Sequence, residues 1–145
     1  MINRAFPNIL SDRVAVTRDF YRDVLGFTVT FDSGWFVNLA SPTDAAGELG
    51  IWRRDHELIP EAYRAAPAGV VLSVVVDDVD AVHAGAAERG VTVVAPPRDQ
   101  FYGQRSCLLR DPDGLLVDVS TPCAMSDEFA ASLETVDGVV RQRRG

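Results

Sequence analysis

The stretch SDRVAVTRDFYRDVLGFTVTF, residues 11–31, contains the pattern that decides the fold of this chain. Asp12 stands where a helix is expected to begin, apolar residues then recur at helical spacing, and Gly26 stands where the helix is expected to end. The stretch DVDAVHAGAAERG, residues 78–90, repeats the order of an acidic residue, a helical pattern and a closing glycine. Because one pattern occurs twice, we predict that a single supersecondary unit is used in tandem.

Each copy of the pattern lies within the order strand, helix and three further strands. Strands are expected over residues 5–10, 27–31, 34–40 and 49–53 in the first half and over residues 70–76, 91–95, 106–109 and 115–119 in the second. We expect Asp12 or Thr17 to cap the first helix and Asp78 to open the second. The sequence DPDG, residues 111–114, reads as a hairpin turn, because Pro and Gly favour the backbone angles of such turns.

Length and composition leave room for one domain. The chain has 145 residues, of which 47% are hydrophobic, so it is long enough to bury a core without disulfides. We therefore predict a single α+β domain over residues 1–145. Its parts are a first module over residues 3–55, a linker over 56–68, a second module over 69–122 and a C-terminal helix over about 126–140, capped by Ser126.

Charge and cysteine content argue against several classes of protein. The formal net charge of −7 disfavours nucleic acid as a partner, because phosphates attract clustered Lys and Arg, and the basic residues within 141–144 are expected to be a solvated terminus. Cys107 and Cys123 form no CxxC motif and are expected to be reduced thiols. With no apolar run of about 18 residues and no signal-peptide core, we expect a cytoplasmic protein with no membrane partner.

Three stretches that overlap these patterns occur in order along the chain: DFYRDVLGF (residues 19–27), VDDVDAVHAGAAERGV (residues 76–91) and YGQRSCLLRDPDGLLVDVS (residues 102–120). Together they resemble the vicinal oxygen chelate superfamily, which includes glyoxalase I, bleomycin-resistance proteins, fosfomycin-resistance enzymes and extradiol dioxygenases. The resemblance implies the glyoxalase/bleomycin resistance fold, with two tandem βαβββ modules forming a curled mixed sheet around a cavity, commonly in a homodimer. It does not choose a reaction, since one fold hosts many chemistries.

The resemblance also implies where a metal would bind. Metal-dependent members usually carry a His in the first strand of each module and a Glu in the last strand of one or both. In this chain the first-strand positions fall on Ala5 or Phe6 and on Val70 or Val71. None of these side chains can bind a metal, so these ligand positions are lost in both modules.

The remaining candidate ligands are too few for a metal. The last-strand positions fall near Glu48 and on Asp118, whereas Mg²⁺ or Mn²⁺ prefers several anionic oxygens. His56 in the linker and His83 in the second helix have no paired His or Cys. No nucleotide-binding glycine motif is present either, so we predict neither a metal nor another cofactor.

The candidate cavity is aromatic and polar. Its expected ligand-binding residues are Trp35, Phe36, Asn38, Glu48, Trp52, Phe101, Tyr102, Arg105 and Asp118. Alternation along a strand would place Glu48, Gly50 and Trp52 on one face. By the same rule Trp35 and Phe36 would point to opposite faces, so that only one of them lines a given cavity.

Alternatives remain for these candidates. Aromatic residues in strands often belong to the core instead. Asp118 can accept hydrogen bonds from Ser120 or Arg105, and Arg105 can instead bind a ligand carboxylate. No catalytic residue is identified, since Cys107 lies in an apolar strand that favours an inert thiol.

We therefore predict a metal-free protein that binds a small aromatic or drug-like molecule. The resemblance is greatest to the bleomycin-resistance branch, which implies antibiotic resistance by sequestering a drug without altering it. The alternative is a lyase, isomerase or dioxygenase resembling glyoxalase I, which would use Glu48 and Asp118 with a metal or as acid and base. A third hypothesis is an interaction or regulatory domain that kept the fold and lost the pocket.

Overall fold

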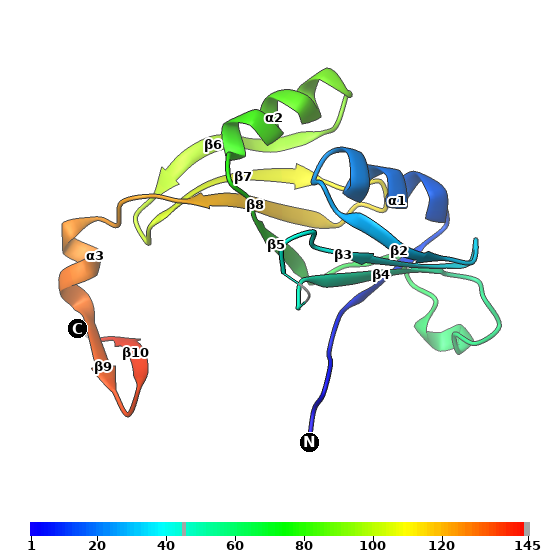
Figure 1. The fold of residues 1–145 in the computed structure, drawn as a ribbon, viewed down its shortest axis with the longest axis horizontal. Coiled ribbons are helices and arrows are strands. Elements are labelled where there is room, and N and C mark those ends of the chain that lie inside the picture. The colour runs from blue at the N-terminus through cyan, green and yellow to red at the C-terminus, as the bar shows by residue number, and fades with distance from the viewer. Residues whose placement is uncertain (45, 144–145) are drawn as a thin grey trace.

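The computed structural model describes residues 1–44 and 46–143 and contains two βαβββ modules (Figure 1). The first module consists of β1 (Asn8–Ser11), α1 (Val14–Asp23), β2 (Thr28–Asp32), β3 (Phe36–Ala40) and β4 (Glu48–Arg53). Its strands form a mixed sheet in the order β1-β4-β3-β2, in which β1 is parallel to β4. A single 3-10 turn, η1 (Glu61–Tyr63), follows in the linker.

The second module repeats this topology. It consists of β5 (Val71–Val75), α2 (Val79–Glu88), β6 (Val93–Gln100), β7 (Gln104–Arg110) and β8 (Leu116–Pro122). The sheet order is β5-β8-β7-β6, with β5 parallel to β8, so the α+β class and the tandem repeat predicted from the sequence are confirmed. Among the helices that the structure describes, none is long and apolar enough to cross a membrane.

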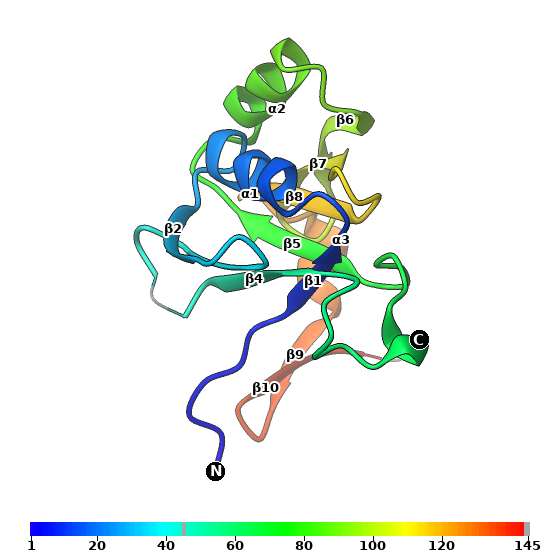
Figure 2. The ribbon, with the colours of Figure 1, turned by 90° about the vertical axis from the view of Figure 1, so that its right-hand side faces the viewer.

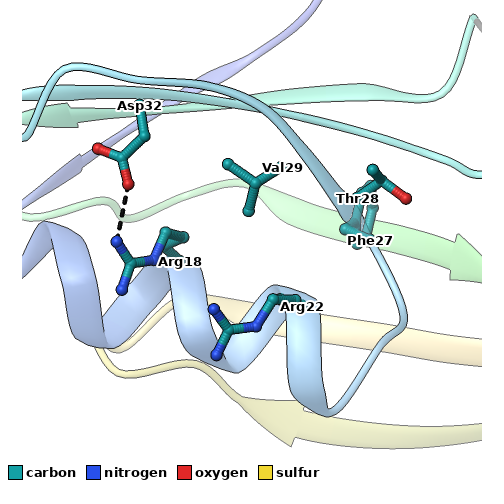
Figure 3. Close-up of a pocket in the computed structure, with 6 residues that line it drawn as sticks. All are labelled: Arg18, Arg22, Phe27, Thr28, Val29 and Asp32. Atoms are coloured by element: carbon teal, nitrogen blue, oxygen red, sulfur yellow. Dashed lines mark hydrogen bonds and ion pairs between the residues drawn. The ribbon is translucent and has the colours of Figure 1, made fainter.

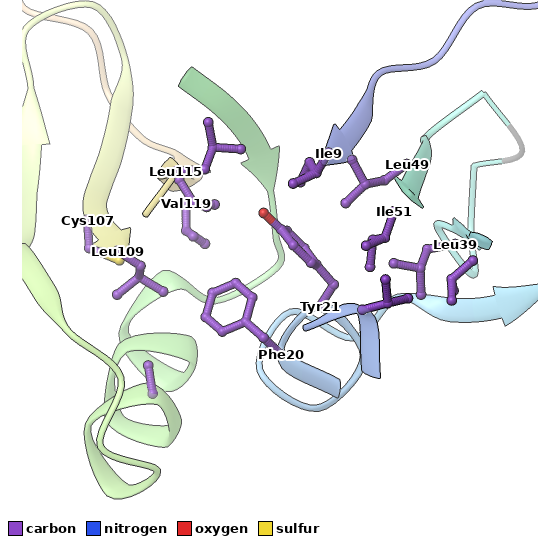
Figure 4. Packing of buried hydrophobic residues seen from close by; sticks show 14 of the residues in the cluster. Ile9, Phe20, Tyr21, Leu39, Leu49, Ile51, Cys107, Leu109, Leu115 and Val119 are labelled. Carbon is purple, nitrogen blue, oxygen red and sulfur yellow. The ribbon is translucent and has the colours of Figure 1, made fainter. Parts of the chain in front are cut away.

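A shared core joins the two modules between their helices and sheets. Alternation turns Leu39 and Ile51 of the first sheet toward the helices, and it does the same for Leu109 and Val119 of the second. Tyr21 is fully buried and projects from α1 between these two groups (Figure 4). Neither α1 nor α2 covers the opposite face of either sheet, here named the open face (Figures 1 and 2).

One helix start follows the sequence prediction and the other does not. The Asp78 carboxylate caps α2 by accepting a hydrogen bond from the backbone N–H of Ala81. The prediction for the first helix is wrong, because Asp12 pairs with Arg54 at 2.6 Å and Thr17 lies buried inside α1. A side chain engaged in an ion pair or turned into the core is not available to the first backbone N–H groups.

The DPDG turn does more than reverse the chain between β7 and β8. Its Asp113 carboxylate accepts hydrogen bonds from the hydroxyls of Ser11 (2.8 Å) and Thr17 (2.6 Å), both in the first module. Its Asp111 carboxylate accepts one from the Tyr21 hydroxyl at 2.8 Å. The turn is therefore a polar bridge between the modules, here named the intermodule bridge.

The C-terminal region differs from the prediction of one helix over residues 126–140. It contains the short helix α3 (Asp127–Ser132) followed by a hairpin of β9 (Leu133–Val136) and β10 (Val139–Gln142). Asp137 and Gly138 both adopt positive φ, at 52° and 76°, as a tight hairpin turn requires. The prediction followed helical spacing and missed the Asp-Gly signal flanked by valines. Residues 126–143 are named the C-terminal arm below.

Candidate functional site

Four aromatic side chains gather at one end of the open face of the first sheet. The rings of Phe36 on β3 and Trp52 on β4, which are direct cross-strand neighbours, lie 5.9 Å apart. Trp35 lies 6.0 Å from Trp52 and stacks on His56 at 4.1 Å. The expectation that Trp35 and Phe36 diverge is wrong, because Trp35 precedes β3 in a turn at Gly34 and is not bound by strand alternation.

Arg4 binds the acid that the sequence placed in the cavity. Its guanidinium donates to both carboxylate oxygens of Glu48, at 2.7 Å to Oε1, and lies over the Phe6 ring. This hydrogen-bonded pair holds the pKa of the Glu48 carboxyl below its ordinary value. Asn38 also reaches this carboxylate at 3.5 Å. Sequence reasoning missed Arg4, which lies 44 residues away in the chain.

In each module, the first-strand residue nearest the candidate metal-binding acid differs from the one that the sequence analysis expected. β1 begins only at Asn8, whose side chain lies above Gly50 on β4. A Cβ at Gly50 would lie 1.8 Å from the Asn8 Oδ1, so the Asn8 side chain occupies the space that a larger residue at position 50 would need. In the second module the residue paired with Asp118 is Ser73. Neither Asn8 nor Ser73 replaces the histidine that a metal site of this kind would use.

The second sheet forms a pocket of about 450 Å³ between β6, β7 and β8. Its lining consists of Ala95, Pro96, Pro97, Arg98, Gln100, Tyr102, Ser106, Leu108 and Asp118. The Ser106 hydroxyl donates to Oδ1 of Asp118, a partner that the sequence did not indicate. The pocket thus combines apolar walls with one carboxylate, one guanidinium and one phenol.

Of the four expected ligand-binding residues in the second module, Tyr102 and Asp118 line this pocket and the other two lie away from it. Phe101 packs against Phe129 of α3, with ring centroids 5.1 Å apart. Arg105 pairs with Asp80 at 2.8 Å and with Asp99 at 3.0 Å, on the side of the sheet that faces α2. Its pairing with Asp118, which the sequence left open as one alternative, is not what the structure shows. Alternation separates Arg105 from its neighbours on β7 that face the pocket.

The donor set does not fit a divalent cation. Within residues 1–44 and 46–143, no three His, Cys, Asp or Glu side chains come close enough together to hold a metal ion. Glu48 is neutralised by the Arg4 guanidinium, and Asp118 is bound by the Ser106 hydroxyl. A hard cation requires several oxygen ligands with a net negative charge, and here the balancing positive charge is part of the chain.

A second hollow, of about 510 Å³, lies between α1 and β2 (Figure 3). Its charged side chains are already paired. Arg18 binds Asp32 at 2.7 Å, and Arg22 binds Asp23 at 2.6 Å. Because each guanidinium faces a carboxylate of its own chain, we expect this groove to bind a charged ligand more weakly than the pocket of the second sheet does.

Comparisons with known proteins point to one group. A family model described as Glyoxalase/Bleomycin resistance protein/Dioxygenase superfamily matches residues 3–119. A comparison with curated proteins gave no match. Among solved structures, the chain is similar to a member of that superfamily from Sphaerobacter thermophilus, with 25% identity, a TM-score of 0.67, and coverage of 83% of this chain and 98% of the other.

Two other structures resemble the chain over a similar length. The integron cassette protein VCH_CASS1 from V. cholerae has 22% identity and a TM-score of 0.67 over 83% of this chain and 95% of its own. This similarity shows the fold alone. TnmS3, an antibiotic binding protein from a Streptomyces species, has 25% identity and a TM-score of 0.63 over 84% of this chain and 97% of its own. The fold is therefore shared with proteins of known structure, one of which is described as antibiotic binding.

Proposed function

The chain belongs to the Glyoxalase/Bleomycin resistance protein/Dioxygenase superfamily, and on that basis we propose that it is a metal-free protein that binds and sequesters a small aromatic or drug-like molecule. The observation that carries the proposal is the pocket of the second sheet. Its volume of about 450 Å³ and its mixture of apolar walls with a few polar groups are typical of small-molecule sites. The similarity to the antibiotic binding protein TnmS3 supports the same conclusion.

Each part of the site has a physical role in this proposal. In the pocket, Tyr102 supplies a flat surface and Asp118 accepts a hydrogen bond from the ligand with the oxygen that Ser106 leaves open. On the first sheet, Phe36 and Trp52 supply an aromatic wall. The Trp52 Nε1 is buried without a hydrogen-bond partner among the residues that the structure describes.

The proposal also covers the oligomeric state and the cellular compartment of the protein. We propose that the protein works as a homodimer, because α1 and α2 leave the open faces of both sheets uncovered. We place it in the cytoplasm, where the free thiols of Cys107 and Cys123 stay reduced. Its biological effect would be antibiotic resistance by sequestration.

Replacing Tyr102 with Ala is expected to weaken binding of an aromatic probe by at least about tenfold, because the ring forms part of the pocket wall. Asp118→Asn should have a similar effect on a cationic probe. The probes are bleomycin and a polycyclic quinone, titrated while the fluorescence of Trp35 and Trp52, the two tryptophans of the chain, is recorded.

Phe101→Ala is the matched control for this experiment. Phe101 directly precedes Tyr102 in the sequence and is 60% exposed. It packs on Phe129 and is not part of the pocket lining. Its replacement should change the dissociation constant by less than about twofold. Equal losses from both substitutions would contradict the pocket assignment, and no saturable quenching by either probe would contradict sequestration of an aromatic ligand.

Purified protein is expected to retain less than about 0.1 equivalent of metal after incubation with Mn²⁺, Ni²⁺, Zn²⁺ or Fe²⁺ and desalting, because Glu48 and Asp118 are already bound by protein groups. Elemental analysis measures this directly. Near-stoichiometric metal that disappears in Glu48→Ala or Asp118→Ala would refute the metal-free proposal. It would favour the lyase, isomerase or dioxygenase alternative instead.

A further inference from the structure

The pocket of the second sheet contains two opposite charges that do not neutralise each other. Arg98 on β6 and Asp118 on β8 both line it. Among the residues that the structure describes, Arg98 forms no ion pair with Asp118 or with any other carboxylate. The pocket therefore presents a positive and a negative group at the same time.

Most other arginines of the chain have a partner within the chain. Seven form ion pairs with carboxylates: Arg4, Arg18, Arg22, Arg53, Arg54, Arg105 and Arg143. Three more donate to backbone carbonyls: Arg13, Arg64 and Arg89. Arg98 is exposed and lines a pocket without such a partner, so its guanidinium can reach an anionic group of a ligand.

A β-bulge in β6 turns Arg98 toward the pocket. The register with β7 shifts between the pairs Ala95–Leu108 and Arg98–Ser106, so that β6 has one residue more than β7 in this interval. Along a regular strand, three steps from Ala95 would place residue 98 on the opposite face of the sheet. The extra residue, in a stretch that contains two prolines, returns Arg98 to the face of Ala95.

The next residue confirms this orientation. Asp99 forms an ion pair with Arg105 at 3.0 Å, on the side of the sheet that faces α2. Arg98 thus lies on the open face, in register with Ser106, whose hydroxyl donates to Oδ1 of Asp118. The guanidinium, the hydroxyl and the carboxylate therefore follow one another across β6, β7 and β8.

The two charges are separated by an apolar floor. β7 lies between β6 and β8, so the Cα atoms of Arg98 and Asp118 are at least about 10 Å apart. Leu108 lines the pocket from β7, and Tyr102 and two prolines line it from the ends of the neighbouring strands. A flat apolar body can lie on this surface with a charged group at each end.

We propose that the pocket recognises a zwitterionic aromatic molecule, whose basic group binds Asp118 and whose acidic group binds Arg98. The inference rests on the proposed function and deepens it by naming the chemical class of the ligand. A ligand with one charge would cover the other charge of the pocket without giving it a partner, which is unfavourable. A ligand with both charges pairs with each of them.

The test uses four small molecules that share one ring and differ in charge. The compound para-(aminomethyl)benzoic acid carries both charges, para-methylbenzylamine only the positive one, para-toluic acid only the negative one and para-xylene none. NMR titration of the isotope-labelled full chain gives each dissociation constant and shows which backbone amides respond. The zwitterion should bind at least about tenfold more tightly than either singly charged compound, with the largest shifts in β6, β7 and β8.

Two substitutions assign the charges to their residues. Arg98→Gln should weaken binding of the zwitterion by at least about tenfold and change that of para-methylbenzylamine by less than about twofold. Asp118→Asn should weaken binding of the zwitterion and of the amine, and it should spare para-toluic acid. A merely structural role of either residue would not produce this crossed pattern, because a damaged pocket would lose all the ligands together.

Arg89→Gln and Asp99→Asn are the matched controls. Each changes the net charge by one unit, as the test substitutions do. Arg89 is exposed at the end of α2, and Asp99 lies on the other face of β6 from the pocket. Both variants should keep every dissociation constant within about twofold of that of the normal chain.

Three results would overturn the proposal: equal binding of the zwitterion and a singly charged compound, an effect of Arg98→Gln no larger than that of Arg89→Gln, or no response in β6–β8 to any of the four compounds. The failure of the proposed function looks different. If bleomycin or the quinone binds through Tyr102 but the charge pattern is absent, sequestration stands and the zwitterionic class falls. If the charge pattern appears but neither larger probe binds, the reverse holds.

Discussion

Replacing Asp111 with Ala is expected to lower the free energy of unfolding by about 3 kcal/mol. The Asp111 side chain is only 4% exposed, and it accepts hydrogen bonds from the Tyr21 hydroxyl and from the backbone N–H groups of Asp113 and Leu115. Its removal would leave all three donors without this acceptor, and unsatisfied buried donors cost more than the net value of a hydrogen bond. Urea unfolding at pH 7 measures the loss.

Tyr21→Phe isolates one of these hydrogen bonds. It should cost about 1.5 kcal/mol in the normal chain, because the acceptor is a carboxylate, and close to nothing when Asp111 is already Ala. Burial raises the pKa of Asp111, so the carboxylate has a desolvation cost that partly offsets its hydrogen bonds. A loss below about 1 kcal/mol for Asp111→Ala would mean that this offset is nearly complete.

Asp113→Ala is expected to cost about 2 kcal/mol of unfolding free energy. The Asp113 carboxylate binds the hydroxyls of Ser11 and Thr17, both fully buried, and joins the modules at the start of α1. A negative charge beside the first turn of a helix also interacts favourably with its macrodipole. Because no side chain of its own caps α1, this carboxylate from the other module is expected to matter more than an exposed acid would.

Asp12→Ala is the matched control for the intermodule bridge. Asp12 is also an aspartate near the start of α1, but it forms an exposed ion pair with Arg54. Such pairs contribute about 0 to 1 kcal/mol, so Asp12→Ala should leave the urea midpoint nearly unchanged. Equal losses from Asp12→Ala and Asp113→Ala would contradict the assignment of the bridge to Asp113.

The two aspartates of DPDG show how far a local pattern can be taken. As a hairpin turn the motif is legible from the sequence, and Gly114 does adopt a positive φ of 88°. Its second role depends on Ser11, Thr17 and Tyr21, which lie about ninety or more residues earlier in the chain. No spacing rule relates side chains that meet only when two modules pack.

For the C-terminal arm, the sequence analysis followed the wrong one of two local signals. The spacing of its apolar residues favoured one long helix, whereas the Asp-Gly pair between valines favoured a hairpin. Both signals are local, and the structure follows the hairpin after Ser132. The helical prediction holds only for the segment that Ser126 caps.

The sequence by itself determined the repeated βαβββ order, the α+β class, the cap at Asp78 and the aromatic and polar character of the candidate site. These features could be predicted because helical and strand periodicity, turn residues and composition act over a few neighbouring positions. Only the tertiary structure decided that Arg4 neutralises Glu48, that Trp35 stacks on His56 and that Arg105 turns away from the pocket. These contacts depend on which segments become neighbours after the strands pair and the modules pack, and the free energy of that packing is set by burial and pairing across the whole chain.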